Sequence, residues 1–280
     1  MQIGYLGPRG TFSHKAAGLC FPAGELREFR TITQAVLALE KKQIDRTVIP
    51  IENSIQGGVT ETLDCLTETN KIFIIREIVL EIKQSLLANK NYALQEIKKI
   101  CSHPQALAQC QEFIRKNIPM AQIINTASTA FAAHEVSQQD FCACIASIDC
   151  AREYNLVVLS NEIQDNNFNK TRFWVLSRQE NLDLDLDNNN KVNKINKMSV
   201  IIWLENKTGA LYGVLEIFIK YNINLLRIES RPAKTQLGTY VFLLDFEINN
   251  LDLDLIYKLL DSLRNKCQKI KILGRYHKED

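Results

Sequence analysis

The stretch NFNKTRFWVL, residues 167–176, places polar and charged side chains directly before an apolar run. Thr171 offers one hydroxyl group, and Arg172 can bind a carboxylate through two parallel hydrogen bonds. The apolar residues that start at Phe173 are typical of a buried strand. The pattern predicts a hydroxyl and a guanidinium at the entrance of a strand, although a solvated strand edge would show the same residues.

The segment IPIENSIQGGV, residues 49–59, carries a second polar group after a strand-like run. Glu52, Asn53 and Ser54 follow the apolar residues directly, and a Gly pair comes shortly after them. In open α/β sheets, polar residues just past the strand ends line the ligand crevice. A helix start capped by Asn53 or Ser54 would explain part of this pattern.

The segment SHPQALAQC, residues 102–110, predicts the start of a helix over 103–116. Ser102, Gln105 and Gln109 are spaced so that they share one stripe of this helix. The stripe holds a hydroxyl and two amides but no charge, which suits hydrogen bonding to a ligand. A solvated helix face is the alternative interpretation.

The segment GPRGTFS, residues 7–13, joins the first predicted strand to the first predicted helix. Gly7 and Gly10 permit a tight turn, and Thr11 or Ser13 can cap the helix. Free N–H groups at such a helix start attract anions. A plain connection between a strand and a helix would look the same.

These motifs lie at the junctions of alternating strands and helices, which favours an α/β fold with helices on both faces of its sheets. We expect the apolar run over 71–82 to cross into a second lobe and the strand over 172–177 to return from it. A segment rich in Asn, Asp and Lys predicts a linker at 179–197 between domains at 1–178 and 198–276. The second domain shows the βαββαβ order of a ferredoxin-like α+β fold.

The bulk composition excludes several classes of protein. The 280 residues include 34 basic and 32 acidic side chains, so neither nucleic acid nor a membrane is expected as a partner. No apolar run approaches the roughly 20 residues that span a bilayer, and the N-terminus lacks the features of a signal peptide. The eight cysteines form no CxxC pair and only four histidines are present, which favours reduced thiols in a cytoplasmic protein without a metal site.

Taken together and in order, GPRGTFS, IPIENSIQGGV, SHPQALAQC, STAFAA and NKTRF resemble the prephenate dehydratases. TGALY and IESRP, in the second domain, resemble the phenylalanine-binding ACT domain attached to those enzymes. The resemblance covers residues 2–178 and about 198–276. It implies a lyase of phenylalanine biosynthesis that decarboxylates and dehydrates prephenate to phenylpyruvate without a cofactor. It also implies a catalytic domain of two lobes, similar to periplasmic ligand-binding proteins, with the site in the cleft.

The same resemblance assigns roles to individual residues. It implies that Thr171 is the catalytic group, which we expect to donate a hydrogen bond to the departing oxygen, with a proton relayed from a neighbour or water. Asn53, Ser102 and Gln109 should line the catalytic site with it. The expected substrate-binding residues are Thr11, Ser13, Glu52, Ser54, Arg172 and Phe173. Arg172 could instead brace the fold, because consecutive strand residues face opposite ways.

In the second domain the resemblance implies feedback regulation by phenylalanine in a homodimer or homotetramer. The expected phenylalanine-binding residues are Asn206, Gly209, Ala210, Leu211, Glu229, Ser230, Arg231 and Pro232. Family members usually carry Pro where this chain has Thr208, so the turn before Gly209 should be looser.

Three alternatives stay open at this point. An arogenate dehydratase would use the same chemistry on the transaminated substrate. A non-catalytic sensor of small molecules would have the same two lobes, and a degenerate enzyme kept for phenylalanine sensing would have the same domains. Because the chain begins at its first predicted dehydratase strand, we expect no fused chorismate mutase.

Overall fold

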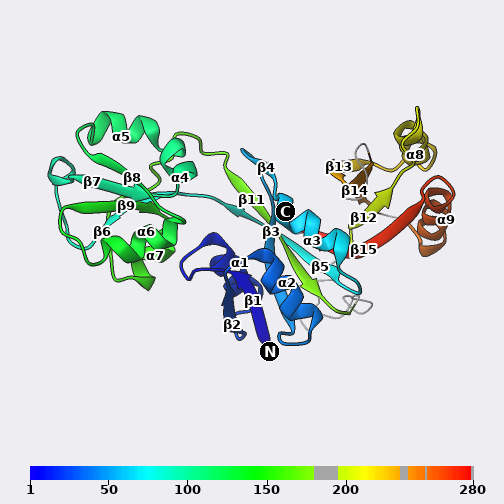
Figure 1. Cartoon of the computed structure of the whole chain (residues 1–280), viewed down its shortest axis with the longest axis horizontal. Helices are drawn as coiled ribbons and strands as arrows, with labels where there is room; N and C mark the ends of the chain where they lie inside the picture. The colour runs from blue at the N-terminus through cyan, green and yellow to red at the C-terminus, as the bar shows by residue number, and fades with distance from the viewer. Residues whose placement is uncertain (180–194, 234–238, 250, 279–280) are drawn as a thin grey trace.

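The computed structural model describes residues 1–179, 195–233, 239–249 and 251–278. These residues form three parts in a row (Figure 1). The first lobe, in the middle of the row, is built from the N-terminal segment and two later strands. The second lobe lies on one side of it, and the C-terminal part lies on the other.

The first lobe is a mixed sheet with helices on both faces, as the alternation predicts. Its strand order is β5-β11-β3-β1-β2, and the short β4 pairs with β3. Helix α1 packs on one face together with Phe173 and Val175, and helices α2 and α3 pack on the other face. The elements are β1 (Gln2–Leu6), α1 (Phe12–Cys20), β2 (Glu25–Phe29), α2 (Ile32–Glu40), β3 (Arg46–Asn53), β4 (Gly57–Gly58), α3 (Thr60–Glu68), β5 (Phe73–Glu81) and β11 (Lys170–Ser177).

The second lobe has its own five-stranded sheet, in the order β10-β6-β9-β7-β8. Its elements are β6 (Ser85–Ala88), the short helix η1 (Leu94–Glu96), β7 (Lys99–Ser102), α4 (Pro104–Gln109), α5 (Gln111–Asn117), β8 (Gln122–Asn125), α6 (Thr129–Val136), β9 (Cys142–Ala146), α7 (Ile148–Glu153) and β10 (Val157–Ser160). The chain enters this lobe after β5 and leaves it before β11, so the predicted crossing and return are confirmed (Figure 1). The cysteines are all free and mostly buried, as expected.

The single helix expected over 103–116 is wrong, because the chain breaks it at Cys110 into α4 and α5. Asp165 holds the break from both sides. Its N–H donates to the carbonyl of Gln109 at 2.7 Å, and its carboxylate accepts from the N–H of Glu112 at 3.2 Å. A carboxylate at the start of a helix is a favourable cap. Since Asp165 lies more than 50 residues away in the sequence, local periodicity could not reveal this break.

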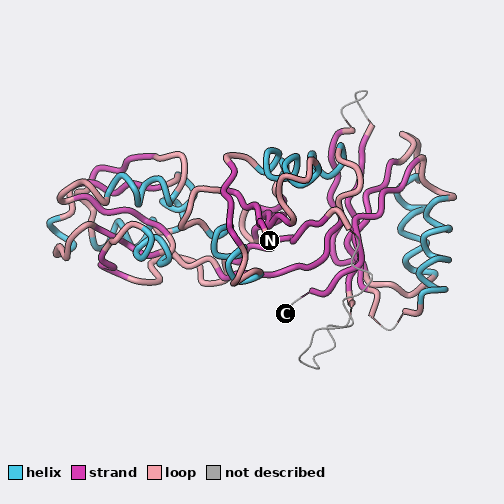
Figure 2. The backbone as a smooth tube through the Cα atoms, turned by 90° about the horizontal axis from the view of Figure 1, so that it is seen from below, coloured by secondary structure: helices cyan, strands magenta, loops and turns pink. Residues whose placement is uncertain are grey.

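The C-terminal part has the βαββαβ order that the sequence predicts. Its elements are β12 (Lys197–Trp203), α8 (Ala210–Lys220), β13 (Leu225–Pro232), β14 (Tyr240–Glu247), α9 (Leu253–Arg264) and β15 (Lys269–Lys278). Helices α8 and α9 cover one face of its strands (Figure 2). Most of the predicted linker lies outside the described residues. The predicted end of the linker at Lys197 is wrong, because Lys197 is buried and is the first residue of β12.

The C-terminal part is not a separate body, because its last strand continues the sheet of the first lobe. Strand β15 pairs in parallel with β5, with His277 opposite Arg76 and Lys278 opposite Glu77. The free face of its sheet packs on the α2 and α3 side of the first lobe. No helix within the described ranges is long and apolar enough to cross a membrane.

Gly274 lies where β15 meets β5, and its replacement tests the joint between the two sheets. Its φ is +144°, and a Cβ atom there would collide with the backbone carbonyl of Ile74. We expect Gly274→Ala to lower the free energy of unfolding by roughly 2–4 kcal/mol, because both the conformation and the space are unsuitable. The measurement is the thermal unfolding midpoint by circular dichroism.

Gly18→Ala is the matched control for this prediction. Gly18 lies inside α1, and a Cβ atom there would meet only a side-chain atom of Leu26 at 3.9 Å. A helical Gly→Ala change is neutral or stabilising. Equal melting points for both variants would contradict the close approach of β15 to β5.

Candidate active site

Thr171 and Asn53 lie opposite each other on the adjacent strands β11 and β3. The side-chain amide of Asn53 donates to the Thr171 Oγ1 at 2.9 Å. The Asn53 Oδ1 accepts from the backbone N–H groups of Ile55 and Gln56, at 3.1 and 3.2 Å, and so fixes the amide orientation. Asn53 therefore closes a turn before β4 and does not cap a helix. Its buried amide holds the Thr171 hydroxyl as an acceptor.

A buried asparagine extends this pair toward the second lobe. The Asn169 Oδ1 accepts from the Asn53 amide at 2.7 Å, and the Asn169 amide donates to the Gln109 Oε1 at 3.0 Å. The Gln109 Nε2 is buried and has no hydrogen-bond partner among the described residues. The chain of side chains Gln109, Asn169, Asn53 and Thr171, named here the amide relay, thus joins both lobes.

Asn169 is a site residue that was not predicted from the sequence. It comes two residues before Thr171, directly ahead of β11, and it is 2% exposed. The available signal was the period of two along an extended strand, which places residues 169 and 171 on one face. That signal was hidden because the strand was expected to begin at 172, whereas it begins at Lys170.

Ser102 is not joined to the amide relay by any contact that the structure gives. It is fully buried at the end of β7, and its hydroxyl donates to the carbonyl of Ile145 on β9 at 2.5 Å. His103, and not Ser102, caps α4 by accepting from the N–H of Gln105. In this arrangement Ser102 ties two strands of the second lobe together.

Arg172 points to the opposite side of the sheet from Thr171. Its guanidinium lies between three carboxylates, at 3.4 Å from Glu52, 3.6 Å from Glu77 and 3.6 Å from Asp245. Glu52 lies with it and also approaches Arg227 at 3.9 Å. The predicted substrate contacts of Arg172 and Glu52 are therefore corrected: alternation along the strands turns both side chains toward the C-terminal part.

Two further residues predicted for the substrate serve the fold. Phe173 is 1% exposed and packs in the core under α1. The exposed Ser54 accepts from the N–H of Lys170 at 2.9 Å and donates to the carbonyl of Phe168 at 3.1 Å. Ser54 thus fastens β3 to the segment that enters β11.

Thr11 ends the turn that the first lobe presents to the second, and Ser13 lies in the first turn of α1. Thr11 caps α1 as predicted, because its Oγ1 accepts from the N–H of His14, and it donates to the carbonyl of Pro8 at 2.9 Å. Ser13 is buried. The carbonyl of Gly10 accepts from Ser147 at 2.7 Å, so this turn is in direct contact with the second lobe.

Burial lowers the pKa of His14, which keeps the imidazole neutral at pH 7. The neutral form is required here, because the Nδ1 of His14 accepts from the N–H of Gly10 at 3.2 Å. A neutral imidazole therefore holds the turn that carries Thr11.

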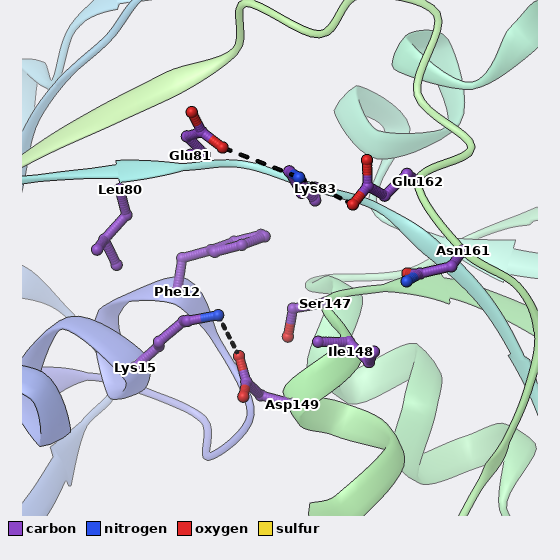
Figure 3. A pocket seen from close by; sticks show the side chains of 10 residues that line it. All are labelled: Phe12, Lys15, Leu80, Glu81, Lys83, Ser147, Ile148, Asp149, Asn161 and Glu162. Carbon is purple, nitrogen blue, oxygen red and sulfur yellow. Dashed lines mark hydrogen bonds and ion pairs between the residues drawn. The ribbon is translucent and has the colours of Figure 1, made fainter.

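A cavity of about 270 Å³ lies between the two lobes (Figure 3). Leu80, which pairs with Thr171, lines it beside Phe12 from the first lobe, and Ser147 and Ile148 line it from the second. The remaining lining residues are Lys15, Glu81, Lys83, Asp149, Asn161 and Glu162. None of the predicted site residues is among them, although the strand position of Leu80 places Thr171 beside the cavity.

Two ion pairs border this cavity, one between the lobes and one between the two segments that connect them. Lys15 of α1 lies 3.1 Å from Asp149 of α7, and Lys83 lies 2.8 Å from Glu162 (Figure 3). The cavity residues Ile148 and Asp149 were not predicted from the sequence, because they lie on helix α7, which was not predicted. Across the described ranges, no group of three or more His, Cys, Asp or Glu side chains is arranged to hold a metal ion.

The residues predicted to bind the regulatory ligand fall into two sets. Gly209 adopts a φ of +81° and begins α8 without a side-chain cap, beside the exposed Asn206. Glu229 and Arg231 instead face the first lobe, where Glu229 lies against Gly58 and Arg231 pairs with Asp64 at 3.2 Å. The remaining predicted residues are Ala210, Leu211, Ser230 and Pro232, of which Ser230 and Pro232 are exposed.

The geometry defines what the Thr171 hydroxyl can do. Because the oxygen accepts from an amide that is itself fixed, its proton is free to be donated elsewhere. A hydroxyl that already accepts a hydrogen bond is a stronger donor, since the two bonds polarise each other. The amide relay is uncharged, so it stabilises a developing negative oxygen without placing an opposing carboxylate beside it.

The model of the prephenate dehydratase family matches residues 3–181 of the chain. The prephenate dehydratase of Bacillus subtilis is 36% identical over 99% of this chain and 98% of its own length. Arogenate dehydratase 2 of Petunia hybrida is 32% identical over 99% of this chain and 71% of its own length.

A solved structure extends the likeness to three dimensions. The prephenate dehydratase of Arthrobacter aurescens, in complex with L-Phe, has a TM-score of 0.87 and 32% identity over 99% of this chain and 90% of its own. Family match, near full-length identity and shared fold agree: the chain belongs to the prephenate dehydratase family.

Proposed function

We propose that this member of the prephenate dehydratase family converts prephenate to phenylpyruvate with Thr171 as the group that assists departure of the ring hydroxyl. The C–C bond to the ring carboxylate breaks and releases CO2. The electron pair of the broken C–C bond enters the ring. The C–O bond then breaks, and the hydroxyl takes up one proton and leaves as water. Aromatisation of the ring drives the reaction, so the step requires no oxidant or reductant.

The observation that carries this proposal is the hydrogen bond from Asn53 to Thr171, beside the cavity between the lobes. Thr171 donates to the departing oxygen, and a water or neighbouring group supplies the proton. A threonine hydroxyl is too weak an acid to give up its own proton fully. Gln109 supports the role of the amide relay, since its Nε2 is buried without a partner among the described residues and is available to a ligand.

We further propose that residues 198–276 form an ACT domain, entered from a linker, that binds phenylalanine and regulates the enzyme. No side chain caps the start of α8 at Gly209, and a helix N-terminus of this kind suits a carboxylate. The Arthrobacter relative was crystallised with L-Phe, which supports phenylalanine as the ligand. Closure of this site by the exposed Ser230 and Pro232 of a second copy fits the proposed homodimer or homotetramer. A cytoplasmic location is part of the same proposal.

The test is an assay of the purified protein with prephenate, with and without phenylalanine, which follows the formation of phenylpyruvate. We expect turnover with prephenate and a change in rate with phenylalanine at millimolar concentration. Arogenate is tested in parallel because a relative of 32% identity is an arogenate dehydratase. A higher kcat/KM with arogenate would overturn the substrate, and no turnover with either would favour the non-catalytic sensor.

A further inference from the structure

Six buried or half-buried charged residues meet between the first lobe and the C-terminal part. They come from six different strands and are named here the junction cluster: Glu52, Glu77, Arg172, Lys197, Arg227 and Asp245. The first three belong to β3, β5 and β11 of the first lobe, and the others belong to β12, β13 and β14. Strands β3 and β11, which carry Asn53 and Thr171 of the amide relay, therefore also contribute the charged side chains of Glu52 and Arg172 to this junction.

The inner part of the cluster is closed to solvent. The side chains of Glu77 and Asp245 are 0% exposed, and that of Lys197 is 1% exposed. Lys197 donates to Glu77 at 2.8 Å, and the indole N–H of Trp174 donates to the same carboxylate at 2.9 Å. In such surroundings the position of a charge is set by its partners and not by water.

Arg172 is bound to both sides of the junction and lies directly next to Thr171 in β11. The guanidinium is 3.6 Å from Glu77 of its own lobe and 3.6 Å from Asp245 of the C-terminal part. Since β11 is paired on both sides, its peptide units move together with their side chains. Because Arg172 and Thr171 are consecutive residues of β11, a shift of the backbone at Arg172 would also move the Thr171 hydroxyl on the other face.

The ion pair between Arg172 and Asp245, at 3.6 Å, is too long for a hydrogen bond. The Arg172 Nη1 and the Asp245 Oδ2 are both buried, and neither has a hydrogen-bond partner among the described residues. Burial raises the pKa of Asp245, while Lys197 and Arg227 oppose this. Unsatisfied buried charges are costly, so a small movement that shortened this contact would be favourable.

The strand that carries Asn53 is held from the same side. Arg227 donates to the carbonyl of Ile51 at 3.4 Å, two residues before Asn53. The carboxylate of Glu229 lies against Gly58, on the strand β4 that follows Asn53. The C-terminal part thus contacts β3 and β4, the two strands on either side of the turn that Asn53 closes.

We propose that Arg172 is a positioning residue, through which contact with Asp245 sets the place of the Thr171 hydroxyl and makes turnover depend on the C-terminal part. The link to phenylalanine rests on the regulation proposed above. The positioning effect itself requires only that the C-terminal part contribute Asp245. The junction cluster is therefore the route by which movement of the regulatory domain reaches the reacting oxygen.

The test replaces Asp245 by Asn, which keeps the shape and the hydrogen bond from Ser199 at 2.6 Å but removes the charge. We expect kcat to fall by about 10- to 100-fold with KM changed less than about threefold, because a small misplacement acts on the chemical step. The response to phenylalanine should be lost.

Lys271→Gln is the matched control. Lys271 also joins the C-terminal part to the first lobe, since it donates to the carbonyls of Leu66 and Thr69, but it does not touch β11. This variant should keep the kcat and the phenylalanine response of the wild type. An equal loss in Lys271→Gln and Asp245→Asn would overturn the route through Arg172.

A second readout does not depend on turnover. The methyl resonance of Thr171, identified by its absence in Thr171→Ala, should shift in Asp245→Asn and stay in place in Lys271→Gln. If Asp245→Asn does not fold, Arg172→Lys replaces it, because a single ammonium cannot reach three carboxylates at once.

The outcomes separate this inference from the proposed function. A wild-type protein without turnover would end the proposed function, while the methyl resonance would still decide the positioning. A wild-type enzyme that ignores phenylalanine would end the regulation, while kcat would still decide the positioning. An unchanged kcat and an unmoved Thr171 resonance would overturn the inference.

Discussion

Thr171→Ala is expected to lower kcat for prephenate by about 10²- to 10³-fold, the range found when one donor to a developing oxyanion is removed. The loss should fall on kcat and not on KM, because the hydroxyl acts on the departing oxygen only as its bond breaks. The fold should persist. Asn53 keeps its hydrogen bonds to Asn169 and to the carbonyl of Lys170, at 2.7 and 3.2 Å.

The measurement is steady-state turnover of prephenate, with the thermal midpoint measured on the same preparations. Thr171→Ser is the matched control, because it keeps the hydroxyl and loses only a methyl group. It should retain turnover within about tenfold, since the remaining cost is rotational freedom of the hydroxyl. A fully active Thr171→Ala variant would remove Thr171 from the mechanism.

The fold was predictable from the sequence where hydrophobic periodicity and turns act locally. The alternation of strands and helices, the crossing to a second lobe and its return, and the βαββαβ order all follow from such signals. Strands β2, β6 and β7, helix α7 and the break at Cys110 were not predicted. Strand β2 is mostly exposed, and the break depends on Asp165, which is distant in the sequence.

The joining of β15 to β5 could not be predicted for a similar reason. Nothing in the composition of residues 269–278 distinguishes a strand that ends one sheet from a strand that continues into another. The signal is a conformational one: Gly274 adopts a positive φ at a close backbone approach. A glycine in a strand suggests such an approach but does not name its partner.

The types of residue at the site could be predicted from the sequence, but the directions in which their side chains point could not. Asn53 and Thr171 are paired across two strands, which requires the register of β3 against β11. Thr171 and Arg172 point to opposite faces of the sheet because side chains alternate along a strand. From the sequence, Arg172 could either bind the substrate or brace the fold. What decides its role is the presence of Asp245 and Glu77, contributed by strands that no local pattern places beside β11.

Asn53→Asp is expected to lower kcat by about 100-fold, because it reverses the direction of the hydrogen bond between residue 53 and Thr171. The substituted carboxylate can still accept from the N–H groups of Ile55 and Gln56, so the turn before β4 should remain. It can no longer donate to Thr171 or to Asn169, which both accept from Asn53. The Thr171 hydroxyl would then donate to the carboxylate, and its proton would point away from the departing oxygen.

The control and the pH dependence of kcat distinguish this effect from simple instability. Asn117→Asp removes a comparable amide donor, 2.9 Å from the carbonyl of Phe113 in α5, and should leave kcat unchanged. Asn53 is 8% exposed, and burial raises the pKa of a carboxyl group. As the pH falls through that raised pKa, the protonated carboxyl can donate to Thr171 again, so kcat relative to wild type should recover on acidification. A loss that is the same at every pH would show that residue 53 acts through the turn and not through the Thr171 proton.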